Sequence, residues 1–200
     1  QPTLQGLCAP AGAPVYQQGA RFLPWEHQMA LLLEFARSRE LDTAELLRSA
    51  GLQAAPLASP QQVLTLLAAL QRALASPDTP FVLGQLSLPG HYGLPSHALL
   101  QAADLRQALQ ILVDHSARLS PLLTPRLLQH GEELILLWTE ACGVAPAQRG
   151  FVVDMQMSAV SALCQWLGGE RLPWRYCFNR TRPRELSQHA VFLGPELQFD

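Results

Sequence analysis

Lysine is absent from the 200-residue sequence, and charged residues of all kinds make up only 15% of it. This is below the roughly one quarter that is usual for soluble proteins, so much of the chain must be buried. All 14 cationic residues are arginine, and the formal net charge is −2. Because phosphate neutralisation needs clustered cations, this composition argues against a nucleic-acid-binding surface within these residues.

Long apolar runs and paired cysteine motifs are also missing. No stretch reaches the roughly 18 uninterrupted apolar residues that a membrane span needs. The start, QPTLQGLCAP, lacks the basic and apolar regions of a signal peptide. The four cysteines form no CxxC pair: Cys8, Cys142, Cys164 and Cys177. We therefore expect a reduced, cytoplasmic setting and no membrane partner.

Recognised catalytic and cofactor motifs are absent as well. The sequence has no GxSxG, HExxH, P-loop or GxGxxG pattern. Glu132 and Glu133 lie beside a predicted turn, where a solvated tip is the usual interpretation. His91 and His97 flank a bend and could in principle ligate a metal, but ordinary loop histidines explain them more simply. The sequence predicts a protein that is not an enzyme and holds no metal or cofactor.

Helices are predicted by cap residues and by apolar periodicity. Asp42, Ser59 followed by Pro60, and Asp104 each precede a periodic apolar run, as helix caps do. The patterns predict helices over 25–40, 43–50, 60–75, 105–119 and 147–167.

Strands are predicted in the second half of the chain. The segments 122–129 and 133–140 flank His-Gly-Glu and indicate a hairpin, with Pro125 at an edge or bulge. Residues 133–140 are apolar on both faces, which predicts a central strand covered on both sides. Further strands are expected over 172–178, 190–193 and 196–199.

These elements predict an α+β fold. An irregular arm over 1–24 is followed by a single domain over 25–200. Its helical part, 25–88, precedes a sheet-containing part, 89–200. We expect a small, mainly antiparallel sheet packed against the two longer helices.

His115 lies near the apolar face of the predicted 105–119 helix. At 100° per residue it falls about 60° from the centre of that face, so we expect it to be partly buried. It is either a core-edge histidine bonded to a backbone carbonyl or a polar contact in a ligand cavity.

The predicted 147–167 helix is apolar around most of its circumference. Its polar residues form one narrow stripe: Asp154, Ser158, Ser161 and Gln165. Gln156 lies roughly opposite, within the apolar arc. A buried amide without a partner costs about 1–3 kcal/mol, so Gln156 needs either a backbone partner or a small-molecule contact. Methionines and large aromatics nearby, Trp166 among them, suit an adaptable pocket.

Two further features allow more than one interpretation. Trp138 on the 133–140 strand is either a core residue or a ligand platform. The only basic cluster consists of Arg171, Arg175, Arg180, Arg182 and Arg184. It is either a solvated loop or a packing surface for a neighbouring domain. A DNA contact is the third interpretation and has little support at this net charge.

Three segments carry a family resemblance. They are 84–138, with YGLPSHALLQAADLRQAL and then LSPLL before the strand pair, 172–183 (LPWRYCFNRTRP) and 189–200 (HAVFLGPELQFD). They resemble the amino-terminal effector domain of AraC-type transcription regulators. The similarity is to the arabinose-binding-like branch, related to ornithine and virulence regulators, and covers most of 25–200. Pro95 departs from the glycine-containing turn more usual in that family.

The resemblance implies effector sensing, often dimerisation, and a helix-turn-helix domain, which we expect after residue 200. We predict the sensing domain of a bacterial transcription regulator: a homodimer that binds a small effector between the sheet and the two long helices. It would reach DNA only through the further domain. Candidate ligand contacts are His115, Trp138, Gln156 and Trp166, with Arg118 and Arg175 for a charged effector. The alternative is a protein-interaction or dimerisation module without a ligand.

Overall fold

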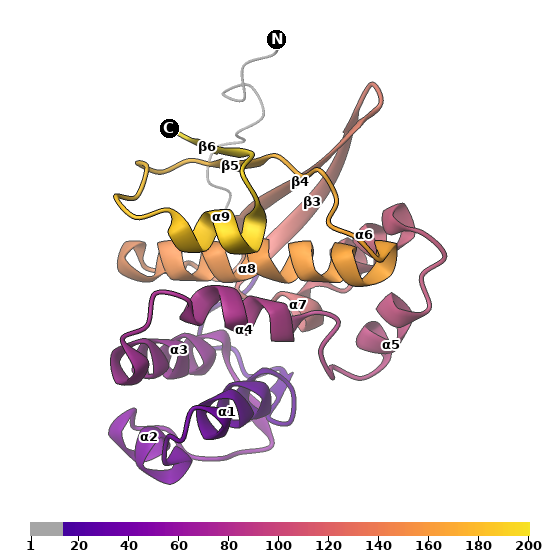
Figure 1. Ribbon diagram of the computed structural model, residues 1–200. Helices are drawn as coiled ribbons and strands as arrows, with labels where there is room; N and C mark the ends of the chain where they lie inside the picture. Colours follow the sequence, from indigo (N-terminus) through magenta and orange to yellow (C-terminus); the bar gives the residue numbers. More distant parts are fainter. Residues whose placement is uncertain (1–13) are drawn as a thin grey trace.

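The computed structural model describes residues 14–200, whose helices are stacked in layers (Figure 1). One end of the stack contains α1 (Gln28–Ser38), α2 (Thr43–Ser49) and α3 (Pro60–Leu74). Beside them β1 (Leu23–Pro24) and β2 (Leu57–Ala58) form a short antiparallel pair.

The helix starts predicted at Asp42 and Ser59 are confirmed, whereas the helix predicted over 25–40 begins at Gln28. Asp42 accepts hydrogen bonds from the backbone N–H groups at the start of α2. Ser59 and Gln62 form a reciprocal capping box at the start of α3, with Pro60 in its first turn. Each cap satisfies N–H groups that have no partner inside the helix.

Residues 14–24 of the predicted arm lie against the rest of the chain. The Tyr16 ring packs edge-on against Phe22, with centroids 4.8 Å apart, and its hydroxyl donates to the Pro121 carbonyl. Leu23 is fully buried. The remainder of that arm, 1–13 with Cys8, lies outside the described residues.

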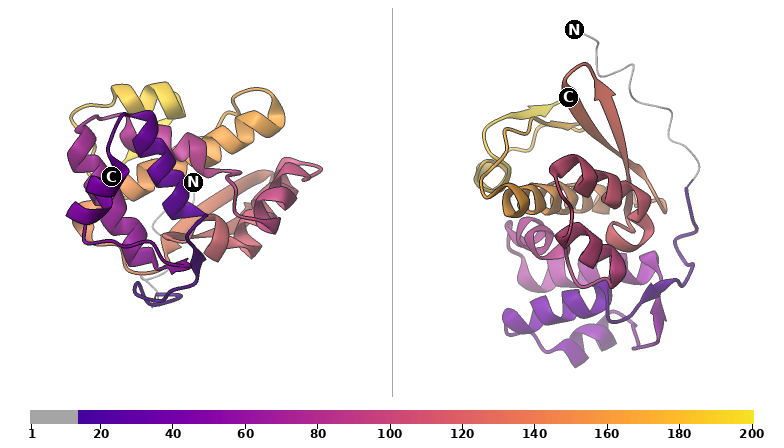
Figure 2. Two further views of the ribbon diagram at one scale, coloured as in Figure 1. Left: turned by 90° about the horizontal axis from the view of Figure 1, so that it is seen from below. Right: turned by 90° about the vertical axis from the view of Figure 1, so that its right-hand side faces the viewer.

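The middle of the stack contains α4 (Thr79–Ser87) and the long α8 (Pro146–Gly168), of which α8 is the orange helix in Figures 1 and 2. The predicted 147–167 helix is therefore confirmed. The two helices meet closely at Gly84, where an added Cβ would lie 2.3 Å from the Met155 carbonyl oxygen. Ser158 of α8 also donates a 2.6 Å hydrogen bond to the Phe81 carbonyl of α4.

The predicted 105–119 helix is wrong as one continuous element. It divides into α6 (Leu105–Asp114), capped by Asp104 as predicted, and α7 (Ser116–Leu119). His115 lies at the break with a non-helical φ of −115° and ψ of 28°. The break turns Leu119 into the core, where it is 3% exposed, and brings the Arg118 carbonyl to Gln28 of α1, which donates to it at 2.6 Å. These tertiary contacts oppose a straight helix.

A further helix, α5 (Leu94–Leu100), follows the glycine-containing segment 90–93. Gly93 supplies a φ of +75° before its first turn. The backbone N–H of Tyr92 donates to Ser96 Oγ at 2.8 Å, and that hydroxyl donates to the Pro89 carbonyl at 2.6 Å. This turn holds Tyr92 in place.

The predicted hairpin is confirmed by β3 (Leu123–His130) and β4 (Glu133–Glu140), which pair antiparallel with Pro125 opposite Trp138. It projects beyond the helical layers (Figures 1 and 2). The prediction that 133–140 is a central strand is wrong, because this sheet has two strands. One face of the strand packs on the core. Every residue of β4 after Glu133 is half-buried, so neither face is fully covered.

The end of the chain forms a small layer on the other side of α8. Here β5 (Tyr176–Phe178) pairs parallel with β6 (Leu197–Phe199), and α9 (Ser187–Leu193) lies between them in sequence. The strand predicted over 196–199 is confirmed, and that over 172–178 is shorter. The strand predicted over 190–193 is wrong: these residues end α9, because helical spacing buries His189 and Leu193 on one face.

The α+β class is confirmed, although the described strands form three two-stranded sheets instead of one. Three apolar clusters make up the core. The first surrounds α1 and α3, the second α6 and the carboxyl-terminal half of α8, and the third contains Phe81, Tyr176, Phe178 and Leu193. Because α8 packs against all three, it connects the parts of the fold. None of the described helices has both the length and the apolar character for crossing a bilayer.

Candidate functional site

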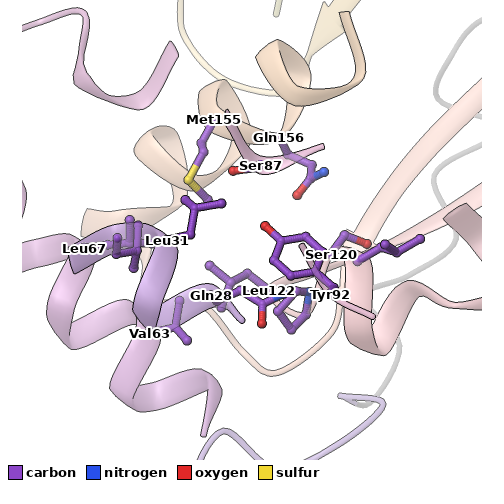
Figure 3. Close-up of a pocket in the computed structure, with 13 residues that line it drawn as sticks. Gln28, Leu31, Val63, Leu67, Ser87, Tyr92, Ser120, Leu122, Met155 and Gln156 are labelled. Carbon is purple, nitrogen blue, oxygen red and sulfur yellow. The ribbon is translucent and has the colours of Figure 1, made fainter. Parts of the chain in front are cut away.

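A cavity lies where α1 and α3 face α8, at the junction of the first two core clusters (Figure 3). Its volume is about 30 Å³, close to the space of one water molecule. The apolar part of its wall comes from α1, α3, α7 with the segment after it, and α8: Leu31, Leu32, Val63, Leu67, Leu119, Pro121, Leu122 and Met155.

Five uncharged polar side chains complete the wall: Gln28, Ser87, Tyr92, Ser120 and Gln156. Among the described residues that line the cavity, none is charged. A few convergent polar groups in an otherwise apolar wall are typical of small-molecule sites.

Gln28 has an unused hydrogen-bonding group at the cavity. It is 8% exposed, and its Nε2 donates to the Arg118 carbonyl. Its Oε1 is buried and has no hydrogen-bond partner among residues 14–200. A buried acceptor without a partner is costly, so this oxygen would gain from a rearrangement of the wall that opens it to a water molecule or a ligand.

Gln156 faces the cavity from α8. It is 6% exposed, and Figure 3 shows its amide directed toward Tyr92. Gln28 and Gln156 therefore approach the cavity from two different helices.

Tyr92 contributes a neutral phenol. Burial raises the pKa of its hydroxyl well above the ordinary value, and a hydrogen bond with Ser87 offsets part of that shift. The His27 ring lies 5.8 Å from the Tyr92 ring. Burial lowers the pKa of His27 below its usual value, so both rings are uncharged near neutral pH.

Of the six residues singled out from sequence, the cavity contains Gln156 alone. Trp138 is half-buried and packs against the first two core clusters. Arg118 reaches the region only through its backbone carbonyl, because its side chain is exposed.

The other three residues lie elsewhere. His115 is exposed at the α6–α7 break, which corrects the expectation of partial burial. Trp166 is 58% exposed near the end of α8, since a residue ten positions after Gln156 is displaced both along and around the helix. Arg175 is exposed and lies 4.0 Å from Glu133.

Sequence reasoning missed Gln28 and Tyr92, the two residues that most define the polar part of the wall. A signal for Gln28 was available, because it precedes Leu32 by four positions and so falls on the buried face of α1. Tyr92 carried no such signal, since it lies in a turn between helices.

A second polar cluster lies on the opposite side of α8. Arg180 Nη2 lies 2.6 Å from Asp154 Oδ1, and His189 Nε2 lies 3.1 Å from the same oxygen. Arg180 Nη1 also donates to the Gly150 carbonyl at 3.0 Å. Aromatic rings surround this group, including Phe178 beneath the guanidinium at 5.1 Å. The cluster fastens the β5–α9–β6 layer to α8 and gives Asp154, one residue of the polar stripe, its partners.

Comparison with known proteins identifies one family. The model described as the arabinose-binding domain of AraC transcription regulators, amino-terminal, matches residues 41–200. A search of curated proteins found no match.

Proposed function

The chain belongs to the family of amino-terminal arabinose-binding domains of AraC transcription regulators, and we propose that it senses a small effector in the cavity between α1, α3 and α8. The observation that carries this proposal is that Gln28, whose Oε1 is buried without a partner, lines the same cavity as Gln156. Buried polar groups in native proteins nearly always have partners, and an effector would supply them.

Effector binding would select a wider form of the cavity. A volume of about 30 Å³ holds little more than a water molecule, so a larger effector must displace wall side chains. Met155 is the most adaptable of these, because its unbranched chain changes rotamer readily. An effector that binds only the wider form shifts the population toward it, which is the basis of a switch.

We further propose that the domain acts as a homodimer and is not an enzyme. It would control DNA binding through a helix-turn-helix domain of the same regulator, in the cytoplasm. The family description supports transcription regulation, and the net charge of −2 disfavours direct DNA contact. Sedimentation equilibrium tests the dimer, and gel shift with the fragment tests the DNA assignment: tight duplex binding by these 200 residues alone would contradict it.

The second candidate is a protein-interaction or dimerisation module without a ligand. The small volume of the cavity favours it, because a filled core needs no effector. This module predicts a concentration-dependent dimer whose thermal midpoint no small molecule raises.

A thermal-shift screen followed by calorimetry distinguishes the two candidates. The compounds should include amino acids, carboxylic acids, sugars and uncharged apolar molecules. A true effector raises the midpoint of the wild-type chain and loses most of its affinity in Gln156→Leu. Gln165→Leu is the matched control, because Gln165 is exposed on the same helix. Equal affinity of wild type and Gln156→Leu for the effector would show that the effector binds outside this cavity.

A further inference from the structure

We infer that the cavity between α1 and α8 takes an uncharged, mostly apolar molecule with one or two hydrogen-bonding groups, such as a small amide, alcohol or lactone. Carboxylates, amines and polyols are excluded. This inference rests on the proposed function, since it specifies the ligand of the same cavity, and it follows from the wall residues.

The absence of counter-charges in the described wall excludes ionic ligands. Gln28, Ser87, Tyr92, Ser120 and Gln156 are all neutral. A buried charge needs an opposite charge or several hydrogen bonds in place of the water it loses. A carboxylate or ammonium group would find neither here.

The arginines near the cavity do not change this conclusion. Arg118 uses its carbonyl to accept from Gln28, while its side chain is exposed. Arg180 is already paired with Asp154, whose side chain leaves α8 about 200° away from that of Gln156. An anionic effector would therefore have to break an existing buried pair or pull an exposed side chain inward.

The number of free polar groups excludes polyols. Ser87 Oγ donates to the Leu83 carbonyl at 2.7 Å, and Ser120 Oγ is 3.4 Å from the Ser116 carbonyl. The groups left without a partner in the wall are few: Gln28 Oε1 has none, and the Gln156 amide is directed toward Tyr92. A pentose brings at least four hydroxyls, each a donor and an acceptor, and most of them would stay unsatisfied.

The positions of these two amides define the ligand further. Gln28 lies on α1 and offers an acceptor, Oε1. Gln156 lies on α8, and its amide offers both a donor and an acceptor. Aliphatic side chains of α1, α3 and α8 fill the space around them. A ligand with one donor–acceptor group and an aliphatic or aromatic body matches this arrangement.

The test is calorimetric titration of the wild-type chain with matched probes. Hexanamide, 1-hexanol and γ-hexalactone are the uncharged probes, while hexanoate, hexylamine and L-arabinose are the comparison set. We expect at least one uncharged probe to bind, and to bind at least tenfold more tightly than its charged counterpart. Gln156→Leu and the milder Gln28→Met should each weaken that probe at least tenfold, while Gln165→Leu leaves it unchanged.

Each other outcome has a distinct meaning. If hexanoate, hexylamine or arabinose binds as tightly as the uncharged probes and Gln156→Leu abolishes it, the ligand class is wrong and the proposed function stands. If no probe of either set binds the folded wild-type chain, the ligand class is refuted, and the thermal-shift screen decides the sensing role separately. Circular dichroism of each variant shows whether lost affinity reflects lost folding.

Discussion

Asp154 and Gln156 lie two residues apart on α8, so their side chains leave the helix about 200° apart. On the Asp154 side, the Arg180 guanidinium, the His189 ring and several aromatic rings enclose the carboxylate. On the Gln156 side, neutral groups face a small cavity, and one of them has no partner among the described residues. Both regions are buried, but they differ in how completely their polar groups are satisfied.

This difference indicates two roles for one helix. A paired and enclosed charge holds two elements together, because separating them leaves an unpaired buried ion. Neutral groups with unused hydrogen-bonding capacity can instead accept a ligand. The Asp154 side resembles an active centre by its charges, but it holds two elements together. The neutral Gln156 side is the candidate binding site.

The largest expected effect is on the charged side. Asp154→Ala should lower the free energy of unfolding by about 3–5 kcal/mol, because it leaves Arg180 without its buried partner. Urea denaturation followed by circular dichroism measures this. The control is Glu133→Ala, whose exposed pair with Arg175 should contribute less than about 1 kcal/mol. If both variants lost similar free energy of unfolding, the Asp154–Arg180 pair would contribute no more than the exposed pair.

The next largest loss of stability is expected at Gly84, where α4 packs closely against α8. Gly84→Ala should destabilise the protein by about 1–3 kcal/mol, since the new Cβ would lie 2.3 Å from the Met155 carbonyl oxygen. Gly168→Ala is the matched control, because its Cβ would meet only the Leu172 side chain at 3.8 Å. A Gly84→Ala variant as stable as wild type would show that α4 and α8 tolerate a wider spacing.

A pH effect is expected from the thiol farther along α8. Burial raises the pKa of Cys164 to about 11 from an ordinary value of 9.0. The folded state thus favours the neutral thiol, and stability from this group is lost as pH rises from about 9 toward 11. At pH 10 the loss should be about 1 kcal/mol relative to pH 8.

Denaturation at both pH values measures this loss in wild type and in Cys164→Ala, which should lack it. The control is Cys177→Ala, at a half-buried position. An identical pH dependence in wild type and Cys164→Ala would assign the alkaline loss to other groups.

The smallest effect on stability is expected on the neutral side. Gln156→Leu should change the free energy of unfolding by less than about 1 kcal/mol, because a buried amide is replaced by an apolar side chain of similar size. The same denaturation series measures it. A loss approaching that of Asp154→Ala would mean that Gln156 has a structural role, and would break the contrast between the two sides.

Local signals predicted much of the fold. The caps Asp42, Ser59 and Asp104 all begin helices, because capping involves only neighbouring residues. The hairpin of β3 and β4 followed from its two apolar runs and the turn between them. Failures occurred where distant contacts decide, as at His115, where packing of Leu119 and the Gln28 bond interrupt the helix.

For the candidate site, the sequence by itself determined that α8 is long, mostly apolar and carries a buried amide at Gln156, because helical periodicity assigns each residue to a face. It also determined the family. Only the tertiary structure decided that Gln28 and Tyr92 join Gln156, and that Arg180 and His189 join Asp154. These groups come from segments far apart in the chain, and no local pattern specifies which distant side chains will meet.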